Sequence, residues 1–273
     1  MRELGDLSII IVVWNTREMT RKCLESIQGA DPEHRWDVIV IDNASQDGTS
    51  SMIRSLFPWV RLIVNKENLG FGRANNLALR EVTTEFALLL NSDASLTSEA
   101  VSRFLQFMKD HPEAGVAGGQ LVYPDGRLQN SIVSFPSLLT EMTNKSLLQI
   151  LFPERYPSKR LHFEGPLEVD SVIGAAMMLR MEAIRSAGYF DEDYFLFLEE
   201  TDLCFRVRKE GWKVFFLPDA RIVHAQGVSV KQVEARARVE YQRSLHLFFE
   251  KNYGQRKAQI VKSFGYLKAW VNL

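Results

Sequence analysis

The sequence predicts an α/β fold built around a largely parallel β-sheet. Within residues 1–119, apolar runs rich in β-branched residues alternate with segments whose apolar residues recur at helical spacing. Continuous apolar runs of this kind are typical of strands that are buried on both faces of a sheet. Strands that alternate with helices predict a parallel sheet covered on both faces, with ligands bound beyond the carboxyl ends of the strands.

Each element of this half has its own signal. The predicted strands are Leu7–Trp14, Val38–Ile41, Arg61–Val64 and Phe86–Leu90. Helices are predicted around three sets of residues that each share one helical face: Cys23, Leu24 and Ile27; Ser50, Ile53 and Phe57; and Val101, Phe104, Leu105 and Met108.

The rest of the chain is less regular. Five of the nine prolines lie between residues 120 and 170, where Pro124–Gly126 predicts the turn of a hairpin. The apolar cluster Leu147–Phe152 lies in the same irregular stretch and is a candidate membrane-facing element. Regular structure is expected again at Val169–Met181 and Lys213–Leu217, and a helix is expected over Lys231–Lys251.

The composition excludes several classes of protein. Of 273 residues, 46% are hydrophobic and 25% are charged, and the formal net charge is −1, which excludes a disordered chain and a strongly basic nucleic-acid-binding protein. Cys23 and Cys204 lack metal-ligand spacing and predict no disulfide framework. Because there is no signal-peptide pattern and no apolar run long enough to span a bilayer, we expect a cytoplasmic protein.

The charge is concentrated at the C-terminus. From Lys231 onward the chain has nine basic residues and three acidic ones, interleaved with aromatic residues. Such a tail can dock on an anionic membrane surface, which would make the protein peripheral on the cytoplasmic face of the inner membrane. The alternative is a solvated helix face whose aromatic residues belong to the core.

An acidic motif follows the second predicted strand. Asp42 ends that strand, within the segment Ile41–Thr49. Its carboxylate can accept a hydrogen bond from a ligand in the crevice, such as the imide N–H of uracil or thymine. It can also cap the turn that follows, so the sequence leaves both roles open.

A second polar motif, Asn91–Ser92–Asp93, follows the fourth predicted strand. Oxygen-bearing side chains at the end of a buried strand suit a hard divalent cation that also holds phosphates. His224 follows another apolar run and fits either a metal ligand or a structural histidine.

A third motif places three carboxylates within four positions, at Glu199, Glu200 and Asp202. If they are buried together, their mutual repulsion raises at least one pKa, as a general base requires. They also fit the first turn of a helix, whose dipole favours negative charge. Both can hold, with Asp202 serving the helix while Glu199 or Glu200 faces the site.

A glycine-rich segment, Asn68–Asn76, leads from a predicted strand into a helix. Gly70 and Gly72 would let the backbone approach a diphosphate at the helix N-terminus. The segment differs from a dinucleotide fingerprint because Asn75 replaces the third glycine and the segment is not part of the first strand–helix unit. We therefore do not expect NAD as the ligand.

Seven motifs occur in one order: strand-W-N-T, V-I-D-N-A-S-x-D-G-T, N-L-G-F-G-x-A-N-N, L-L-N-S-D, G-Y-F-D-E-x-Y-F, L-E-E-T-D-L-C-x-R and V-x-H. The series resembles the inverting family 2 glycosyltransferases, and within them the bacterial rhamnosyltransferase-like branch, over residues 7 to about 250.

The resemblance implies the GT-A fold. In this fold a Rossmann-like nucleotide-binding half, with a central and mostly parallel sheet, is followed by an acceptor-binding half and C-terminal helices. Residues 1–230 would form the glycosyltransferase domain, with the nucleotide-sugar bound by residues 1–119 and the acceptor by residues 120–230. Residues 231–273 would form a basic amphipathic helical extension.

The resemblance also implies roles for single residues. Glu200, or Glu199 beside it, would be the general base, and Asp93 with His224 would hold Mg²⁺ or Mn²⁺. Asn91 departs from the fuller acidic form of the metal motif and leaves one carboxylate in it. The nucleotide-sugar would be bound by Val12, Trp14, Asn15, Asp42, Asn68, Gly70, Arg73, Asn75, Asn91, Ser92 and Gly174.

The implied reaction is the transfer of a sugar, with rhamnose as one option, from a dTDP- or UDP-sugar. The acceptor would be a hydroxyl of a cell-surface glycan or lipid-linked saccharide in bacterial cell-wall polysaccharide biosynthesis. One alternative is a sugar nucleotidyltransferase, which usually opens with a glycine-rich basic loop that Val13–Arg17 does not provide. Another is a catalytically silent nucleotide-sugar-binding module, against which the acidic residues at 93, 199, 200 and 202 argue.

Overall fold

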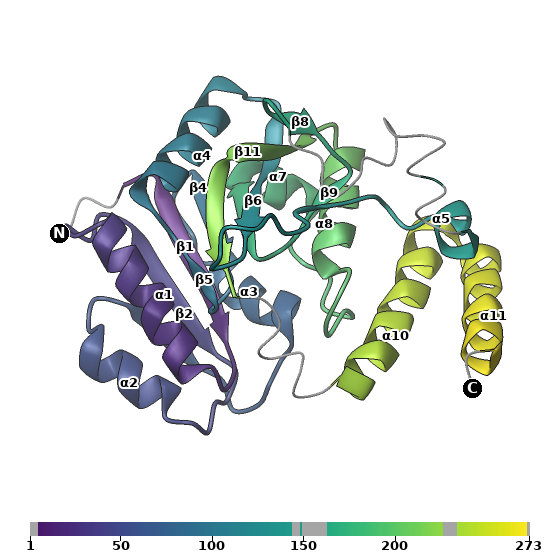
Figure 1. The fold of residues 1–273 in the computed structure, drawn as a ribbon, viewed down its shortest axis with the longest axis horizontal. Coiled ribbons are helices and arrows are strands. Elements are labelled where there is room, and N and C mark those ends of the chain that lie inside the picture. Colours follow the sequence, from purple (N-terminus) through teal and green to yellow (C-terminus); the bar gives the residue numbers. More distant parts are fainter. Residues whose placement is uncertain (1–4, 144–147, 149–162, 226–233, 272–273) are drawn as a thin grey trace.

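The computed structural model describes residues 5–143, 148, 163–225 and 234–271 (Figure 1). Its strands are β1 (Leu7–Val13), β2 (Asp37–Asp42), β3 (Arg61–Val64), β4 (Phe86–Leu90), β5 (Ala94–Ser95), β6 (Ala114–Val122), β7 (Ile132–Val133), β8 (Leu167–Glu168), β9 (Ser171–Val172), β10 (Ala176–Arg180) and β11 (Lys213–His224). Its helices are α1 (Arg17–Ala30), α2 (Thr49–Leu56), α3 (Phe71–Leu79), α4 (Ser98–Asp110), α5 (Leu138–Met142), α7 (Met181–Ala187), α8 (Glu199–Lys209), α10 (Glu234–Tyr253) and α11 (Gln255–Val271).

The centre of the molecule is a nine-stranded sheet. Its strand order is β3-β2-β1-β4-β10-β6-β11-β5, with β8 pairing with β11 off this path, and β7 pairs with β9 in a separate small sheet. The strands β3, β2, β1 and β4 are parallel, whereas β10 runs antiparallel to both of its neighbours. The expected α/β fold is therefore confirmed.

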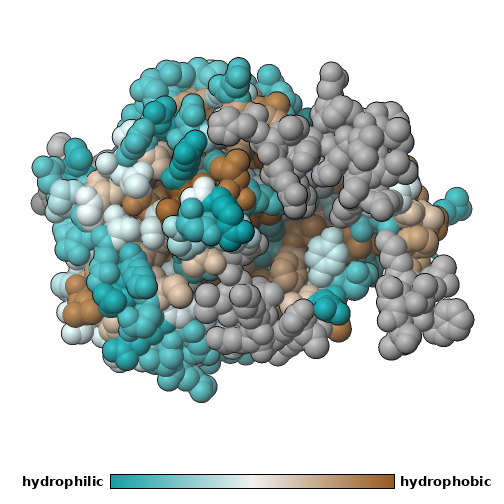
Figure 2. Space-filling view, viewed as in Figure 1, coloured by the Kyte–Doolittle hydropathy of each residue, from teal (hydrophilic) through white to brown (hydrophobic). Residues whose placement is uncertain are grey.

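The four strands predicted in the first half are present, and helices cover both faces of the sheet. Ile9 and Ile11 of β1 pack with residues of α1, α2 and α4, while Ile10 packs with residues of α3, α7 and α8. The outer surface over α1 and α2 is mostly hydrophilic (Figure 2). β3 differs from the expectation because it is an edge strand, and Val64 at its end is 46% exposed.

The strand β6 has no clear signal in the sequence because it is rich in glycine and alanine (AGVAGGQLV). Two of its glycines allow close packing. A Cβ on Gly118 would lie 2.4 Å from Cβ of Val172, and one on Gly119 would lie 2.4 Å from the carbonyl oxygen of Ala220. A side chain at either position would separate the strand from its neighbours.

The C-terminal helices α10 and α11 lie side by side against the second half of the chain (Figure 1). Leu245, Phe248 and Phe249 of α10 are buried with Tyr194 and Leu198 from the segment that precedes α8. Phe248 and Phe249 are therefore core residues, and a contact of the rest of the tail with a membrane stays a prediction.

Two expectations about the membrane fall partly outside the described residues. Of Leu147–Phe152 only Leu148 is described, and it is buried. The side chains of Tyr266 and Trp270 in the tail also lie outside the described part. None of the described helices combines the length and the hydropathy that crossing a bilayer requires.

Candidate active site

The carboxyl ends of β1, β2 and β4 bring three of the predicted motifs to one edge of the sheet. Asn15 has a φ of 51°, its backbone N–H donates to Ser45 Oγ (2.9 Å), and its Oδ1 accepts from the N–H of Gln46 (2.8 Å). On the other side, Thr16 Oγ1 lies 3.1 Å from Ser92 Oγ. The loop after β1 is thus tied to the loops after β2 and β4.

Asp42 lies at this edge but is fully buried. Its carboxylate accepts hydrogen bonds from the backbone N–H of Ser45 (2.8 Å) and from the hydroxyl of Ser50. Of the two roles left open for Asp42, these contacts support the cap of the turn after β2. The contact with a pyrimidine base stays a prediction. Val12 and Trp14 remain partly exposed at the same edge.

Asp93 and His224 form a close pair. His224 Nε2 lies 3.2 Å from Asp93 Oδ1, and both side chains are largely buried. Gln129 donates from Nε2 to the carbonyl oxygen of His224, so its Oε1 is the atom that lies 2.9 Å from His224 Nδ1. Nδ1 therefore carries a proton, and Nε2 is the ring atom that faces the Asp93 carboxylate, where it offers a lone pair to a cation whenever it is unprotonated.

A carboxylate oxygen and a nitrogen lone pair that face each other are the donor set of a cation site. Two ligands at right angles, each about 2.1 Å from one ion, lie about 3 Å apart, which fits the distance between Asp93 and His224. Among the described residues, no group of three or more His, Cys, Asp or Glu side chains is arranged to hold an ion. These two side chains therefore suit a cation that takes its other ligands from a bound substrate and water.

Gly174 and Ala175 connect this pair with the acidic cluster of α8. The backbone N–H of Asn91 donates to the carbonyl oxygen of Ala175 (3.0 Å). A Cβ on Gly174 would lie 3.7 Å from Cβ of Glu200 and 3.5 Å from the ring of Phe71. Residues that are far apart in the sequence thus meet along one short segment before β10.

Glu199 and Glu200 open α8 and differ in their surroundings. Glu199 is 3% exposed, and its Oε2 has no hydrogen-bond partner among the described residues. Burial, together with the neighbouring Glu200, raises the pKa of Glu199 well above its ordinary value. Burial also raises the pKa of the partly exposed Glu200, although backbone N–H groups, including those of Thr201 and Gly174, partly offset that rise.

The loop before α8 packs directly against the glycine-rich segment at the start of α3. Gly70 has a φ of 81°, and a Cβ there would lie 2.3 Å from the carbonyl oxygen of Phe195. That oxygen accepts a hydrogen bond from the N–H of Phe71 (3.2 Å), and the N–H of Gly70 donates to Asn68 Oδ1 (2.9 Å). The N–H groups of Gly70 and Phe71 thus both have partners within the chain. The approach of a diphosphate to this segment stays a prediction.

Two other residues of this segment face in different directions. Arg73 is exposed and lies 3.6 Å from Glu192. Asn75 is buried, and its Nδ2 donates to the carbonyl oxygen of Phe71, while its Oδ1 has no partner among the described residues. Neither contact is with Asp93 or His224.

Three residues of the site were not predicted from the sequence. Thr16 bonds to Ser92, Gln129 orients His224, and Phe195 closes over Gly70. The W-N-T motif contained a signal for Thr16. Phe195 ends the G-Y-F-D-E-x-Y-F motif, but its partner Gly70 lies more than 100 positions away. Gln129 had no signal, because its partner His224 lies 95 positions away.

Comparison with known proteins gives consistent results. The family model described as Glycosyl transferase family 2 matches residues 8–188. The chain is 26% identical over 259 residues to the N-acetylglucosaminyl-diphospho-decaprenol L-rhamnosyltransferase of Mycobacterium tuberculosis, covering 89% of this chain and 83% of the relative. It is 24% identical over 255 residues to the low-salt glycan biosynthesis hexosyltransferase Agl10 of Haloferax volcanii, covering 86% and 72%.

Solved structures share the fold. The mannosyltransferase PcManGT from Pyrobaculum calidifontis, in complex with GDP-Man and Mn²⁺, aligns with a TM-score of 0.63 at 19% identity over 92% of this chain and 65% of that chain. GalNAc-T7 with UDP, GalNAc and Mn²⁺ aligns with a TM-score of 0.61 at 13% identity, over 82% and 44%. At these identities the likeness establishes the GT-A fold.

Proposed function

The chain belongs to glycosyl transferase family 2, and from that premise we propose that it is a metal-dependent, inverting enzyme that uses a nucleotide-linked sugar. One observation carries the proposal. The Gly174–Ala175 segment contacts Glu200 on one side and Asn91 on the other, which supports a site in which the Glu200 carboxylate and the Asp93–His224 pair act together. A base and a diphosphate-binding cation at one strand edge are what this reaction requires.

Asp93 and His224 would hold the cation. We favour Mn²⁺ over Mg²⁺ because an imidazole nitrogen is a softer ligand than Mg²⁺ prefers. When bound, the ion neutralises negative charge on the nucleoside diphosphate. Gln129 fixes the ring orientation and tautomer of His224, so that Nε2 faces the ion. The Mn²⁺ in the PcManGT and GalNAc-T7 structures supports this assignment.

Glu200 would act as the general base. Its carboxylate takes the proton of an acceptor hydroxyl while the hydroxyl oxygen forms a bond to the anomeric carbon. The bond from that carbon to the diphosphate oxygen breaks in the same displacement, which inverts the anomeric centre. Partial exposure lets Glu200 meet the acceptor, whereas Glu199 is enclosed and, with its raised pKa, is suited to stay protonated.

For the substrates, we propose a dTDP- or UDP-sugar donor, with L-rhamnose as the first sugar to test. The relative from Mycobacterium tuberculosis is named as a rhamnosyltransferase acting on a diphospho-decaprenol saccharide, and this name supports a lipid-linked acceptor. We assign the donor to residues 1–119 and the acceptor to residues 120–230, with residues 231–273 as a helical extension.

A lipid-linked acceptor calls for contact with a membrane, and the face formed by α5 and α11 suits it. Leu139, Met142 and Ile260 are 45–47% exposed, and a groove of about 630 Å³ is lined by Met142, Arg256, Gln259, Ile260, Ser263 and Phe264. Gln255–Val271 contains four basic residues and no acidic one, so its charge is complementary to an anionic bilayer. We expect the protein to co-sediment with phosphatidylglycerol vesicles but not with phosphatidylcholine vesicles. Failure to co-sediment with either kind of vesicle would exclude this docking.

The proposed function is tested by measuring transfer and donor binding separately. Glu200→Gln should lower kcat by about 10²–10⁴-fold and leave the Mn²⁺-dependent thermal shift with UDP or dTDP in place. Glu210→Gln, an exposed carboxylate at the other end of the same helix, is the matched control and should keep wild-type activity. Full activity of Glu200→Gln would show that the base is another residue, and a product with retained anomeric configuration would exclude a single displacement.

A further inference from the structure

The loop between α7 and α8 leads directly to the two carboxylates of the site, Glu199 and Glu200. It runs from Gly188 to Leu198, and Glu199 is the first residue of α8. Phe197 and Leu198 have φ values of 67° and 63°, a left-handed conformation that residues other than glycine rarely adopt. Such backbone persists only where surrounding contacts hold it. The placement of Glu200 therefore depends on what holds this loop.

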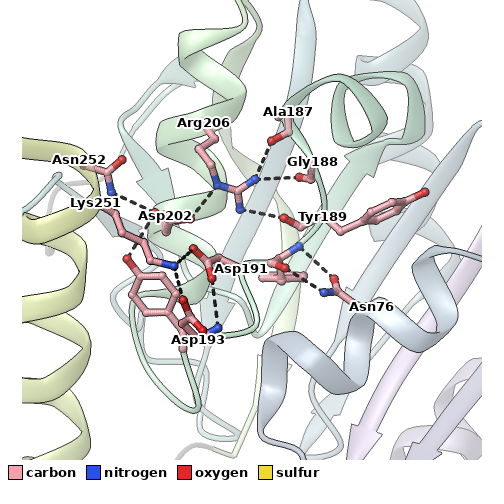
Figure 3. Close-up of polar contacts among 12 residues, drawn as sticks. Asn76, Ala187, Gly188, Tyr189, Asp191, Asp193, Asp202, Arg206, Lys251 and Asn252 are labelled. Atoms are coloured by element: carbon pink, nitrogen blue, oxygen red, sulfur yellow. Dashed lines mark hydrogen bonds and ion pairs between the residues drawn. The ribbon is translucent and has the colours of Figure 1, made fainter.

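The first part of the loop is held by α3 and α8. Asn76 of α3 accepts from the N–H of Phe190 (3.0 Å) and donates to its carbonyl oxygen (2.8 Å). Arg206 of α8 donates to Asp202 (2.8 Å) and to three carbonyl oxygens where α7 ends and the loop begins, those of Ala187, Gly188 and Tyr189 (Figure 3). Among the described contacts, neither side chain bonds to the segment after Tyr194.

The later part of the loop is held by α10. Lys251 Nζ donates to the carboxylates of Asp191 (2.5 Å) and Asp193 (2.6 Å) (Figure 3). Ser244 Oγ donates to the carbonyl oxygen of Leu196 (2.8 Å), one residue before the left-handed pair. The ring of Phe197 packs edge-on against Tyr241 with centroids 6.1 Å apart. α10 thus contacts the loop at Asp191 and Asp193 and again at Leu196 and Phe197, just before Glu199.

The charges around Lys251 make its contact specific. Asp191 and Asp193 both point to the same ammonium group, and the nearby Asp202 is bonded to Asn252 Nδ2 (3.0 Å) and Arg206 (Figure 3). The Lys251 side chain is 31% exposed and that of Asp191 is 24% exposed, so solvent screens this pair less than a fully exposed one. Without the ammonium group, two neighbouring carboxylates would repel each other within the loop.

We propose that α10 is a positioning element of the active site, in which Lys251 and Ser244 hold the loop conformation that places Glu200. This inference rests on the proposed role of Glu200 as the base. The donor crevice is built from the ends of β1, β2 and β4, which none of these α10 contacts involves. Loss of the α10 contacts should therefore lower kcat and leave the donor KM unchanged.

Two variants and one control test this inference. Lys251→Met removes the ammonium group, and Lys251→Arg retains a cation at that position. Lys109→Met is the matched control, because Lys109 pairs with Asp6 (2.8 Å) just before β1, at the opposite edge of the sheet. We expect Lys251→Met to lower kcat by roughly ten-fold at an unchanged donor KM, with Lys251→Arg restoring most of it. Lys109→Met should match the wild type.

Amide hydrogen exchange over residues 190–200 gives a readout that is independent of activity. Exchange there should rise in Lys251→Met and, to a smaller extent, in Ser244→Ala. Ser244→Ala keeps the ion pairs of Lys251, so it tests the inference even if Lys251→Met folds poorly. Raised exchange with an unchanged kcat would overturn the inference, as would unchanged exchange in both variants or an equal loss in kcat and donor binding. A wild type without transfer activity would overturn the proposed function, while exchange would still show whether α10 holds the loop.

Discussion

Substitution of Gly70 by alanine should displace the loop that carries the proposed base. A Cβ on Gly70 would lie 2.3 Å from the carbonyl oxygen of Phe195, and real Cβ atoms essentially never approach closer than 3.0 Å, so α3 and the loop must separate by at least 0.7 Å. Phe195 lies four residues before Glu199, and α10 holds the loop at Leu196. The displacement is therefore expected to reach the carboxylates of α8.

The magnitude follows from two separate costs. Gly70 has a φ of 81° and a ψ of −172°, a conformation that is essentially restricted to glycine, so alanine there costs about 1–3 kcal/mol in backbone strain. Forcing a methyl group into filled space costs about 1–3 kcal/mol more. Gly126 separates the two costs, because its φ is 84° and nothing lies within 4 Å of a Cβ placed there. Gly126→Ala should therefore show the cost of alanine at a positive φ without a clash.

The assay is thermal unfolding of both variants, followed by kcat at saturating donor. For a chain of this size, each kcal/mol lowers Tm by about 2–4 °C, so Gly70→Ala should melt about 2–12 °C below Gly126→Ala. A displacement approaching 1 Å at the reacting groups should lower kcat by about 10–100-fold, whereas Gly126→Ala should retain activity. Equal melting temperatures and equal kcat values in the two variants would refute the steric clash between a Cβ at position 70 and the carbonyl oxygen of Phe195.

Three further predictions follow from the site. Because burial raises the pKa of Glu199, the folded protein holds that proton more tightly than the unfolded chain, and stability falls as pH rises from the ordinary Glu pKa through the raised one. Glu199→Gln should therefore reduce the fall of Tm between pH 5 and 8. The same dependence of Tm on pH in the variant and the wild type would contradict the burial argument. Asp93→Ala, or EDTA added to the wild type, should remove the Mn²⁺-dependent thermal shift with UDP or dTDP, and an unchanged shift would place the ion elsewhere. The hydrogen bond and charge of Lys251 lower the pKa of Asp193, so the α10 contact is present above the ordinary Asp value and is lost as pH falls through the lowered one; hydrogen exchange over residues 190–200 should therefore increase in acid, more in the wild type than in Asp193→Asn.

The parallel half of the fold was predictable because its signals are local. A strand buried on both faces must be apolar at every position, as Leu7–Val13 and Phe86–Leu90 are, and the intervening helices repeat their apolar residues at helical spacing. The polar residues that follow β1, β2 and β4 are equally visible. β6 was not predictable, because the glycines that let it pack against Val172 and Ala220 carry no strand signal of their own.

The sequence by itself determined the family, the strand-end motifs and the helical tail, because each depends on residues that are close together in the chain. The tertiary structure alone decided how those motifs are used. Asp42 is enclosed by its own turn, Gly70 is covered by the carbonyl group of Phe195, and the aromatic residues of α10 pack beside Tyr194. In the last two cases the partner lies dozens of positions away along the chain. Spacing within a motif shows which atoms a side chain can offer, but the packed chain determines which partner those atoms meet.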